Sequence, residues 1–137
     1  MKRLTTLVLV AAGLFSAAAS AGDDTLYTTR LQGDLAVGQD GTLTLEITPA
    51  SGYKWNQDYP AKMELANGKT VAFTKTVLKK AEGDITGDDK VGKVTLKAKG
   101  TAAGTETITG TMSFSLCNAE TCQVLRQRPI PLAVTVK

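Results

Sequence analysis

Two cysteines are the residues of this chain best suited to covalent chemistry. Cys117 and Cys122 are its only cysteines, and residues 118–121 separate them. Asn118 and Thr121 suit a turn that brings the two sulfurs together across a hairpin. Such a pair is ordinarily a disulfide when the chain is exported, and residues 2–21 are typical of an export signal. The spacing therefore predicts a Cys117–Cys122 bond. No metal site is expected, because two cysteines without histidine make a poor zinc site.

Two roles are open for this bond. The first is a structural staple, although closing so short a loop stabilises a protein by only about 2 kcal/mol in the entropy description. The second is exchange with other thiols, because a disulfide on an exposed hairpin can be attacked by a thiolate. The spacing of the cysteines leaves both roles open.

The absence of histidine from the sequence removes several classes of enzyme. Ser-His-Asp and Cys-His nucleophiles, histidine metal clusters and a histidine general base are all excluded. Any catalysis therefore depends on carboxylates, lysine, tyrosine or the two cysteines. No cofactor is expected.

Aromatic residues gather in a second segment, which is a candidate binding surface. Tyr53, Trp55 and Tyr59 include the single tryptophan and two of the three tyrosines. Large rings with polar edges give contact area at low entropy cost, which favours a binding role. The more common alternative is a tryptophan that fills the core of a sandwich. The acidic loop 83–89 lacks the register of a calcium loop and is interpreted as a solvated turn.

The first residues are typical of a secretory signal peptide. Lys2 and Arg3 precede an apolar run at 4–15, and Ala19-Ser20-Ala21 forms a small-residue cleavage site. The apolar run is shorter than the roughly 20 residues of a spanning helix. We therefore expect cleavage after Ala21, one domain at 22–137, a periplasmic or secreted location, and no membrane span after cleavage.

The charge pattern argues against nucleic acid as a partner. The net charge of +3 includes both basic residues of the signal, and the remaining lysines and arginines are scattered along the chain. No basic stripe of the kind that neutralises phosphates is present.

Strict alternation of apolar and polar residues predicts an all-β fold. The pattern favours an antiparallel, immunoglobulin-like β-sandwich of about seven or eight strands. The expected strands are 26–35, 41–48, 63–65, 70–78, 91–98, 106–116 and 130–136, with a shorter one at 122–126. Residues 75–82 are open to a helical turn instead. The expected core includes Leu45, Ile47, Phe73, Phe114, Leu132 and Val134.

The same alternation orients Cys117. Met112, Phe114 and Leu116 share one face of the expected strand, so Ser113, Ser115 and Cys117 lie on the opposite, polar face. Cys117 is therefore expected to end a strand and to point away from the core.

The segment Phe-Ser-Leu-Cys-Asn-Ala-Glu-Thr-Cys at 114–122, with Pro-Ile-Pro-Leu at 129–132, resembles the N-terminal domain of the thiol:disulfide interchange protein DsbD family. Gly-Tyr-Lys-Trp at 52–55 and Tyr-Pro at 59–60 resemble the aromatic segment of that family. The resemblance implies an immunoglobulin-like fold that passes electrons from a membrane partner to periplasmic proteins. It also implies that Cys117 and Cys122 are the redox pair, that Cys122 forms mixed disulfides, and that the partner is a thioredoxin-like or membrane redox protein.

Two alternatives come from other functional classes. The segment 49–55 looks like a loop of chagasin-type inhibitors of cysteine proteases, which would make Tyr53 and Trp55 the contact residues. The other alternative is an exported binding or structural module in which the disulfide is purely structural.

Overall fold

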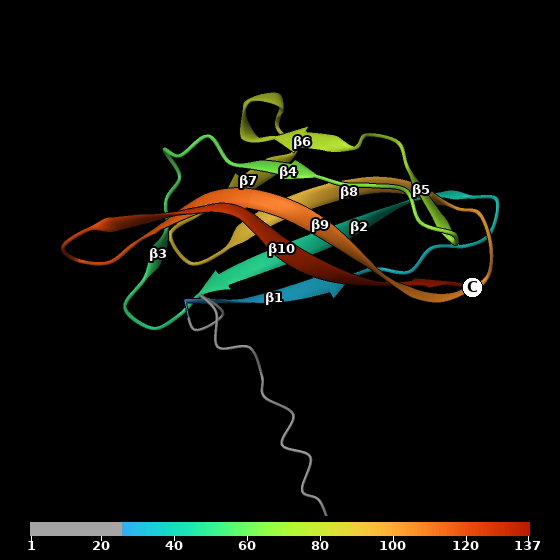
Figure 1. The fold of residues 1–137 in the computed structure, drawn as a ribbon, viewed down its shortest axis with the longest axis horizontal. Coiled ribbons are helices and arrows are strands. Elements are labelled where there is room, and N and C mark those ends of the chain that lie inside the picture. The colour runs from blue at the N-terminus through green and yellow to red at the C-terminus, as the bar shows by residue number, and fades with distance from the viewer. Residues whose placement is uncertain (1–25) are drawn as a thin grey trace, which may run out of the picture.

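Alternating apolar residues build two antiparallel sheets that pack against each other in the computed structural model, which describes residues 26–137 (Figure 1). The expected signal peptide and its cleavage site lie outside the described residues. The first sheet has the order β1 (Tyr27–Gln32), β2 (Asp40–Pro49), β8 (Gly92–Gly100) and β5 (Val71–Phe73), and β7 (Ile85–Gly87) also pairs with β8. The second has the order β10 (Cys122–Val136), β9 (Gly104–Cys117), β4 (Lys62–Glu64) and β6 (Val77–Lys79), and β3 (Lys54–Trp55) also pairs with β9.

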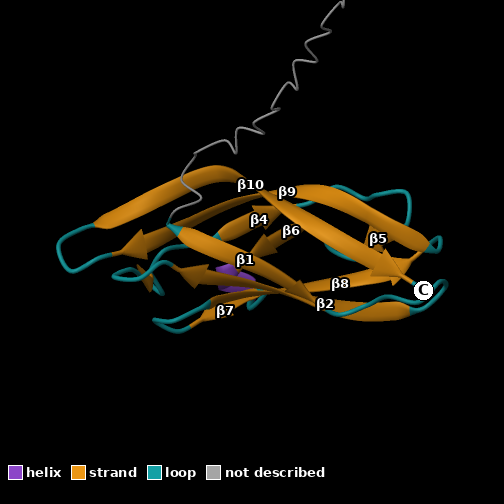
Figure 2. Ribbon diagram, turned by 90° about the horizontal axis from the view of Figure 1, so that it is seen from below, coloured by secondary structure: helices purple, strands orange, loops and turns teal. Residues whose placement is uncertain are grey.

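This strand order is that of an immunoglobulin-like sandwich. One layer contains the first and second strands with β8, and the other contains the last two strands with β4. Figure 2 shows β9 and β10 in one layer and β2, β7 and β8 in the other, with a single short helical turn, η2 (Lys80–Glu82), in the described part of the chain. The predicted all-β, immunoglobulin-like fold class is confirmed.

The inward faces of the strands form one hydrophobic core. All six residues that the alternation places there are buried, with exposed fractions of 6% or less: Leu45, Ile47, Phe73, Phe114, Leu132 and Val134. The ring of Phe114 stacks on Trp55 at a centroid distance of 5.6 Å and meets the edge of Tyr27 at 5.1 Å. Burial of these large rings contributes to the hydrophobic stabilisation.

Trp55 fills the space between the two sheets. It comes from β3 in the second sheet, yet its ring lies over two glycines of the β7–β8 hairpin in the first. A Cβ atom at Gly92 would lie 2.5 Å from Trp55 Cε3, and one at Gly87 would lie 3.0 Å from Trp55 Nε1. Only glycine leaves room for the indole at these positions.

The prediction of one strand at 70–78 is wrong, because this segment forms two strands that belong to different sheets. β5 pairs with β8 and buries Phe73, whereas β6 pairs with β4 and buries Leu78. The chain crosses between the layers at residues 74–76. The helical alternative for 75–82 is correct only for its last part, where η2 follows β6.

The two expected strands near the C-terminus are one strand, β10, interrupted by a bulge. Leu125 pairs with Phe114 and Arg128 pairs with Met112, so two residues of β10 lie opposite Ser113. Gln127 has a φ of 48°, and its N–H donates to the Ser113 hydroxyl at 3.0 Å. The extra residue lets Leu125 point inward on one side of the bulge and Ile130 on the other.

The acidic loop at 83–89 contains a short strand, β7, and is not only a solvated turn. Ile85 in this strand is buried, and β7 pairs with the first residues of β8. Asp84 accepts hydrogen bonds from the ammonium group of Lys75 at 2.6 Å and from the backbone N–H of Lys79 at 3.1 Å. The carboxylate therefore joins the start of β7 to the β6 segment.

A Gly92→Ala substitution tests the packing of Trp55. We expect it to lower the free energy of unfolding by about 1–3 kcal/mol, because the added methyl group overpacks the site. In a Trp55→Leu background the same substitution should cost much less. Urea unfolding of the four proteins of this double-mutant cycle measures the coupling. Equal costs in both backgrounds would contradict the contact.

An Asp84→Asn substitution tests the β6–β7 connection through its pH dependence. The hydrogen bond from Lys75, followed by that from the Lys79 N–H, lowers the pKa of Asp84 below its usual value near 3.8, against the opposing effect of burial. A lowered pKa gives stability that is present above the unfolded-state value and is lost as the pH falls through the folded-state value. Thermal unfolding should therefore show a destabilised variant at neutral pH and a shrinking difference in acid. The exposed Asp40→Asn variant is the control.

Candidate functional site

The disulfide predicted from the cysteine spacing is present and joins the last residue of β9 to the first of β10. Cys117 and Cys122 lie directly opposite each other in the antiparallel ladder, with a Cα–Cα distance of 3.9 Å and an S–S distance of 1.98 Å. Figure 1 shows this hairpin projecting at one end of the sandwich. The bond therefore closes the tip of a long hairpin.

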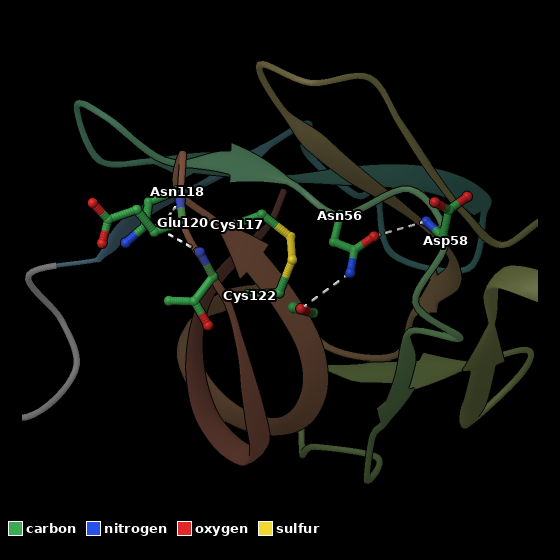
Figure 3. The surroundings of a disulfide bond; sticks show 8 residues. Asn56, Asp58, Cys117, Asn118, Glu120 and Cys122 are labelled. Atoms are coloured by element: carbon green, nitrogen blue, oxygen red, sulfur yellow. Dashed lines mark hydrogen bonds between the residues drawn. A yellow bond between two sulfur atoms is a disulfide. The ribbon is translucent and has the colours of Figure 1, made fainter.

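The turn between the cysteines is held by its own hydrogen bonds. The side-chain oxygen of Asn118 accepts from the N–H of Glu120 at 2.9 Å and from the N–H of Thr121 at 2.8 Å (Figure 3). The N–H of Asn118 donates to the Thr121 carbonyl at 2.8 Å. These bonds form an Asx turn, so the reversal of the chain has hydrogen bonds of its own in addition to the disulfide.

The two sulfurs differ in their surroundings. Cys122 is exposed on the edge strand β10, whereas Cys117 is half-buried between β10 and β3. Lys54 of β3 lies directly opposite Cys117, and both residues line a shallow hollow together with Asn56 and Asp89. Cys117 thus has the outward orientation expected from the alternation, but it is partly covered.

Ser115 lies on the face of β9 that the alternation predicts to be polar, yet it is buried. It is 1% exposed, because Asn56 covers it. The Asn56 side-chain amide donates to the Ser115 hydroxyl at 3.3 Å, and the Asn56 N–H donates to the Ser115 carbonyl at 3.0 Å. The N–H of Asp58 in turn donates to the Asn56 side-chain oxygen at 3.0 Å, as Figure 3 shows.

Charged groups lie beside the hollow without forming a strong ion pair. The Lys54 ammonium is 4.0 Å from the Asp89 carboxylate, and the two side chains are 70% and 61% exposed. An exposed pair at this distance contributes little to stability. Among residues 26–137 no group of histidine, cysteine or acidic side chains is arranged to hold a metal ion.

The aromatic residues proposed for binding lie in or against the core. Trp55 is 4% exposed, so the more common alternative, a core position, holds for it. Tyr53 and Tyr59 are partly buried and pack against the same core. The segment thus presents no open cluster of rings, and a binding role for its tyrosines stays a prediction.

Lys54 and Asn56 are the neighbours of the disulfide that sequence reasoning missed. Trp55 between them points into the core, so both residues must face outward beside the end of β9. The alternation around Trp55 could have shown that they share a face. Only the pairing of β3 with β9 places that face next to Cys117.

An Asn118→Ala substitution tests whether the turn forms without help from the sulfurs. It leaves the N–H groups of Glu120 and Thr121 without their acceptor and should lower the free energy of unfolding by about 1 kcal/mol. We expect a similar loss in the reduced and the oxidised protein, measured by urea unfolding with and without dithiothreitol. Glu120→Ala is the control at a neighbouring exposed position. A loss of stability found only in the reduced protein would contradict the idea that the turn closes independently of the disulfide.

Comparisons with known proteins do not identify a family for this chain. No family description matches the sequence, and no curated protein matches it. A similar solved structure is the cohesin module from the Clostridium perfringens ATCC13124 family 33 glycoside hydrolase. The TM-score is 0.42 at 10% identity, covering 82% of this chain and 97% of that chain. In residues 26–137 no helix has the length and hydropathy needed to span a membrane.

Proposed function

We propose that this protein is an exported thiol–disulfide exchange domain whose Cys117–Cys122 bond accepts or relays electrons. The observation that carries the proposal is the position of the bond at the projecting tip of the β9–β10 hairpin, with Cys122 exposed on an edge strand. A thiolate can approach such a sulfur without any unfolding of the sandwich. Thiol–disulfide exchange requires that access.

The reaction is a pair of displacements at sulfur. The thiolate of a reducing partner attacks Sγ of Cys122, the Cys117–Cys122 bond breaks, and its electron pair leaves on Sγ of Cys117, which takes a proton from water. A second thiol of the partner then loses its proton and attacks the partner's sulfur in the mixed disulfide. Sγ of Cys122 leaves with the electron pair and takes up a proton. The partner dithiol is oxidised to a disulfide, and this domain gains two thiols.

The contribution of the bond to the fold is small. The antiparallel ladder continues from Cys117 and Cys122 to the far end of β9 and β10, and Asn118 closes the turn. In the entropy description a loop this short contributes only about 2 kcal/mol. The hairpin can therefore persist in both the oxidised and the reduced protein, as an electron carrier requires.

The resemblance of the cysteine hairpin to the DsbD N-terminal domain supports the same function. It implies that the sulfur of Cys122 forms the mixed disulfide. This role is consistent with the greater exposure of Cys122 compared with Cys117. We propose a thioredoxin-like or membrane redox protein as the partner, in the periplasm or outside the cell. A binding module with a purely structural disulfide is the competing function.

Equilibration with glutathione or dithiothreitol mixtures tests the proposal. A structural disulfide lies below about −300 mV, whereas we expect this bond to be reduced at a higher potential. A Cys117→Ser variant keeps Cys122 and should trap mixed disulfides with proteins of the exporting cell. The matched Cys122→Ser variant, which leaves only the half-buried Cys117, should trap far less.

Two results together would contradict thiol–disulfide exchange. One is a bond as hard to reduce as a structural disulfide. The other is the absence of any mixed disulfide trapped by Cys117→Ser. The competing structural function would then account for the bond.

A further inference from the structure

The outer edge of β10 is closed along most of its length. β10 is the edge strand of the second sheet. Pro129 and Pro131 have no N–H to offer to another strand. Farther along, the Thr135 carbonyl accepts from the Leu35 N–H at 3.0 Å, and the Lys137 N–H donates to the Leu35 carbonyl at 2.8 Å. These features block the addition of a further strand to this part of the sheet.

The stretch of β10 beside the disulfide is open. The Ser115 carbonyl accepts from Asn56 and is therefore turned away from β10. Val124 lies opposite Ser115 in the antiparallel ladder. Because the backbone groups of Ser115 point away from β10, the N–H and carbonyl of Val124 point away from β9, toward the open edge. Cys122, two residues earlier on the strand, has the same orientation. Within residues 26–137 these outward groups have no backbone partner.

We propose that the Cys122–Val124 edge binds an extended, acidic segment of the thiol-bearing partner, which pairs with β10 as an added strand. This inference rests on the proposed exchange function and names the surface that the partner uses. An extended polypeptide is the fitting occupant, because its backbone offers donors and acceptors at the spacing of the free groups on Cys122 and Val124.

The charge of this edge indicates the chemistry of the segment. Residues 121–131 contain no aspartate or glutamate. Of their two arginines, Arg128 is half-buried and already has an interaction partner, so the charge of this edge is that of Arg126. Arg126 is exposed, and it lies just past the open stretch, at the bulge. Acidic side chains on the added strand complement this charge, whereas basic ones are repelled.

The open edge also places the reacting groups together. Val124 is 42% exposed and shares the face of Cys122, so an added strand gains an apolar contact next to the disulfide. A cysteine on that strand lies beside Sγ of Cys122. Holding the attacking thiolate there raises its effective concentration at the sulfur that it must attack.

Single-cysteine peptides test the proposal on the Cys117→Ser protein, whose Cys122 forms one mixed disulfide. The probes are a heptapeptide with glutamates on both sides of its cysteine and the same peptide with lysines. The measured quantity is the equilibrium constant for exchange of each peptide against glutathione. We expect the glutamate peptide to be favoured over glutathione and over the lysine peptide.

A Val124→Pro substitution removes the outward N–H without removing a bond between β9 and β10. It should lower the exchange constant of the glutamate peptide about fivefold, which is the effect of losing one backbone hydrogen bond. Val124→Ala keeps the N–H and should lower the constant much less. Ala133→Pro introduces a proline farther along β10, away from the open stretch, and should leave the exchange constant of the glutamate peptide unchanged.

Amide hydrogen exchange gives a second measurement that does not depend on whether Val124→Pro folds. In the mixed disulfide with the glutamate peptide, the Val124 N–H should exchange several-fold more slowly than in the glutathione adduct. Equal amide exchange rates in the two adducts would overturn the proposal. Equal disulfide-exchange constants for the protein with valine at position 124 and for a folded Val124→Pro variant would overturn it as well.

The remaining outcomes separate this proposal from others. A concentration-dependent dimer that slows amide exchange of the Val124 N–H without peptide would show that a second copy of this chain occupies the edge. That result would also overturn the proposal. If the disulfide proves structural but the peptide preference holds, the exchange function fails and the edge still binds strands. If exchange holds without peptide preference, only the docking surface fails.

Discussion

The burial of Trp55 is the interaction on which the arrangement of the candidate site depends. Its ring stacks on Phe114 and lies over Gly87 and Gly92, which fixes β3 against the end of β9. Because neighbouring residues of a strand point to opposite faces, an inward Trp55 forces Lys54 and Asn56 outward. These two residues then lie beside Cys117 and Ser115. A core contact thereby determines the surroundings of a surface disulfide.

The bulge in β10 divides that strand into parts with different roles. Beyond it, β10 buries Ile130, Leu132, Val134 and Val136, and its outer edge is closed by prolines and by Leu35. Before it, only Leu125 is buried, and the outer edge stays open beside Cys122. The extra residue opposite Ser113 reconciles the two parts, because without it one of them would turn its apolar side chains to water.

The core contacts and the disulfide are thus separated along one hairpin. The far ends of β9 and β10 belong to the core and are held by burial and by the ladder between the strands. The tip carries the disulfide, an Asx turn and mostly exposed side chains. A change of oxidation state at the tip therefore alters few of the contacts that stabilise the sandwich, which suits the proposed exchange.

The sequence by itself determined the class of fold, the inward residues of the strands and the disulfide. Alternation has a period of two residues and is local, so Leu45, Phe114 and Val134 could be placed in the core without knowing any partner strand. The tertiary structure alone decided that 70–78 divides between the sheets, that β10 contains a bulge, and that Asn56 covers Ser115. Asn56 and Ser115 are 59 residues apart in sequence, and no local period reports such pairing. It depends on how the strands pack around Trp55.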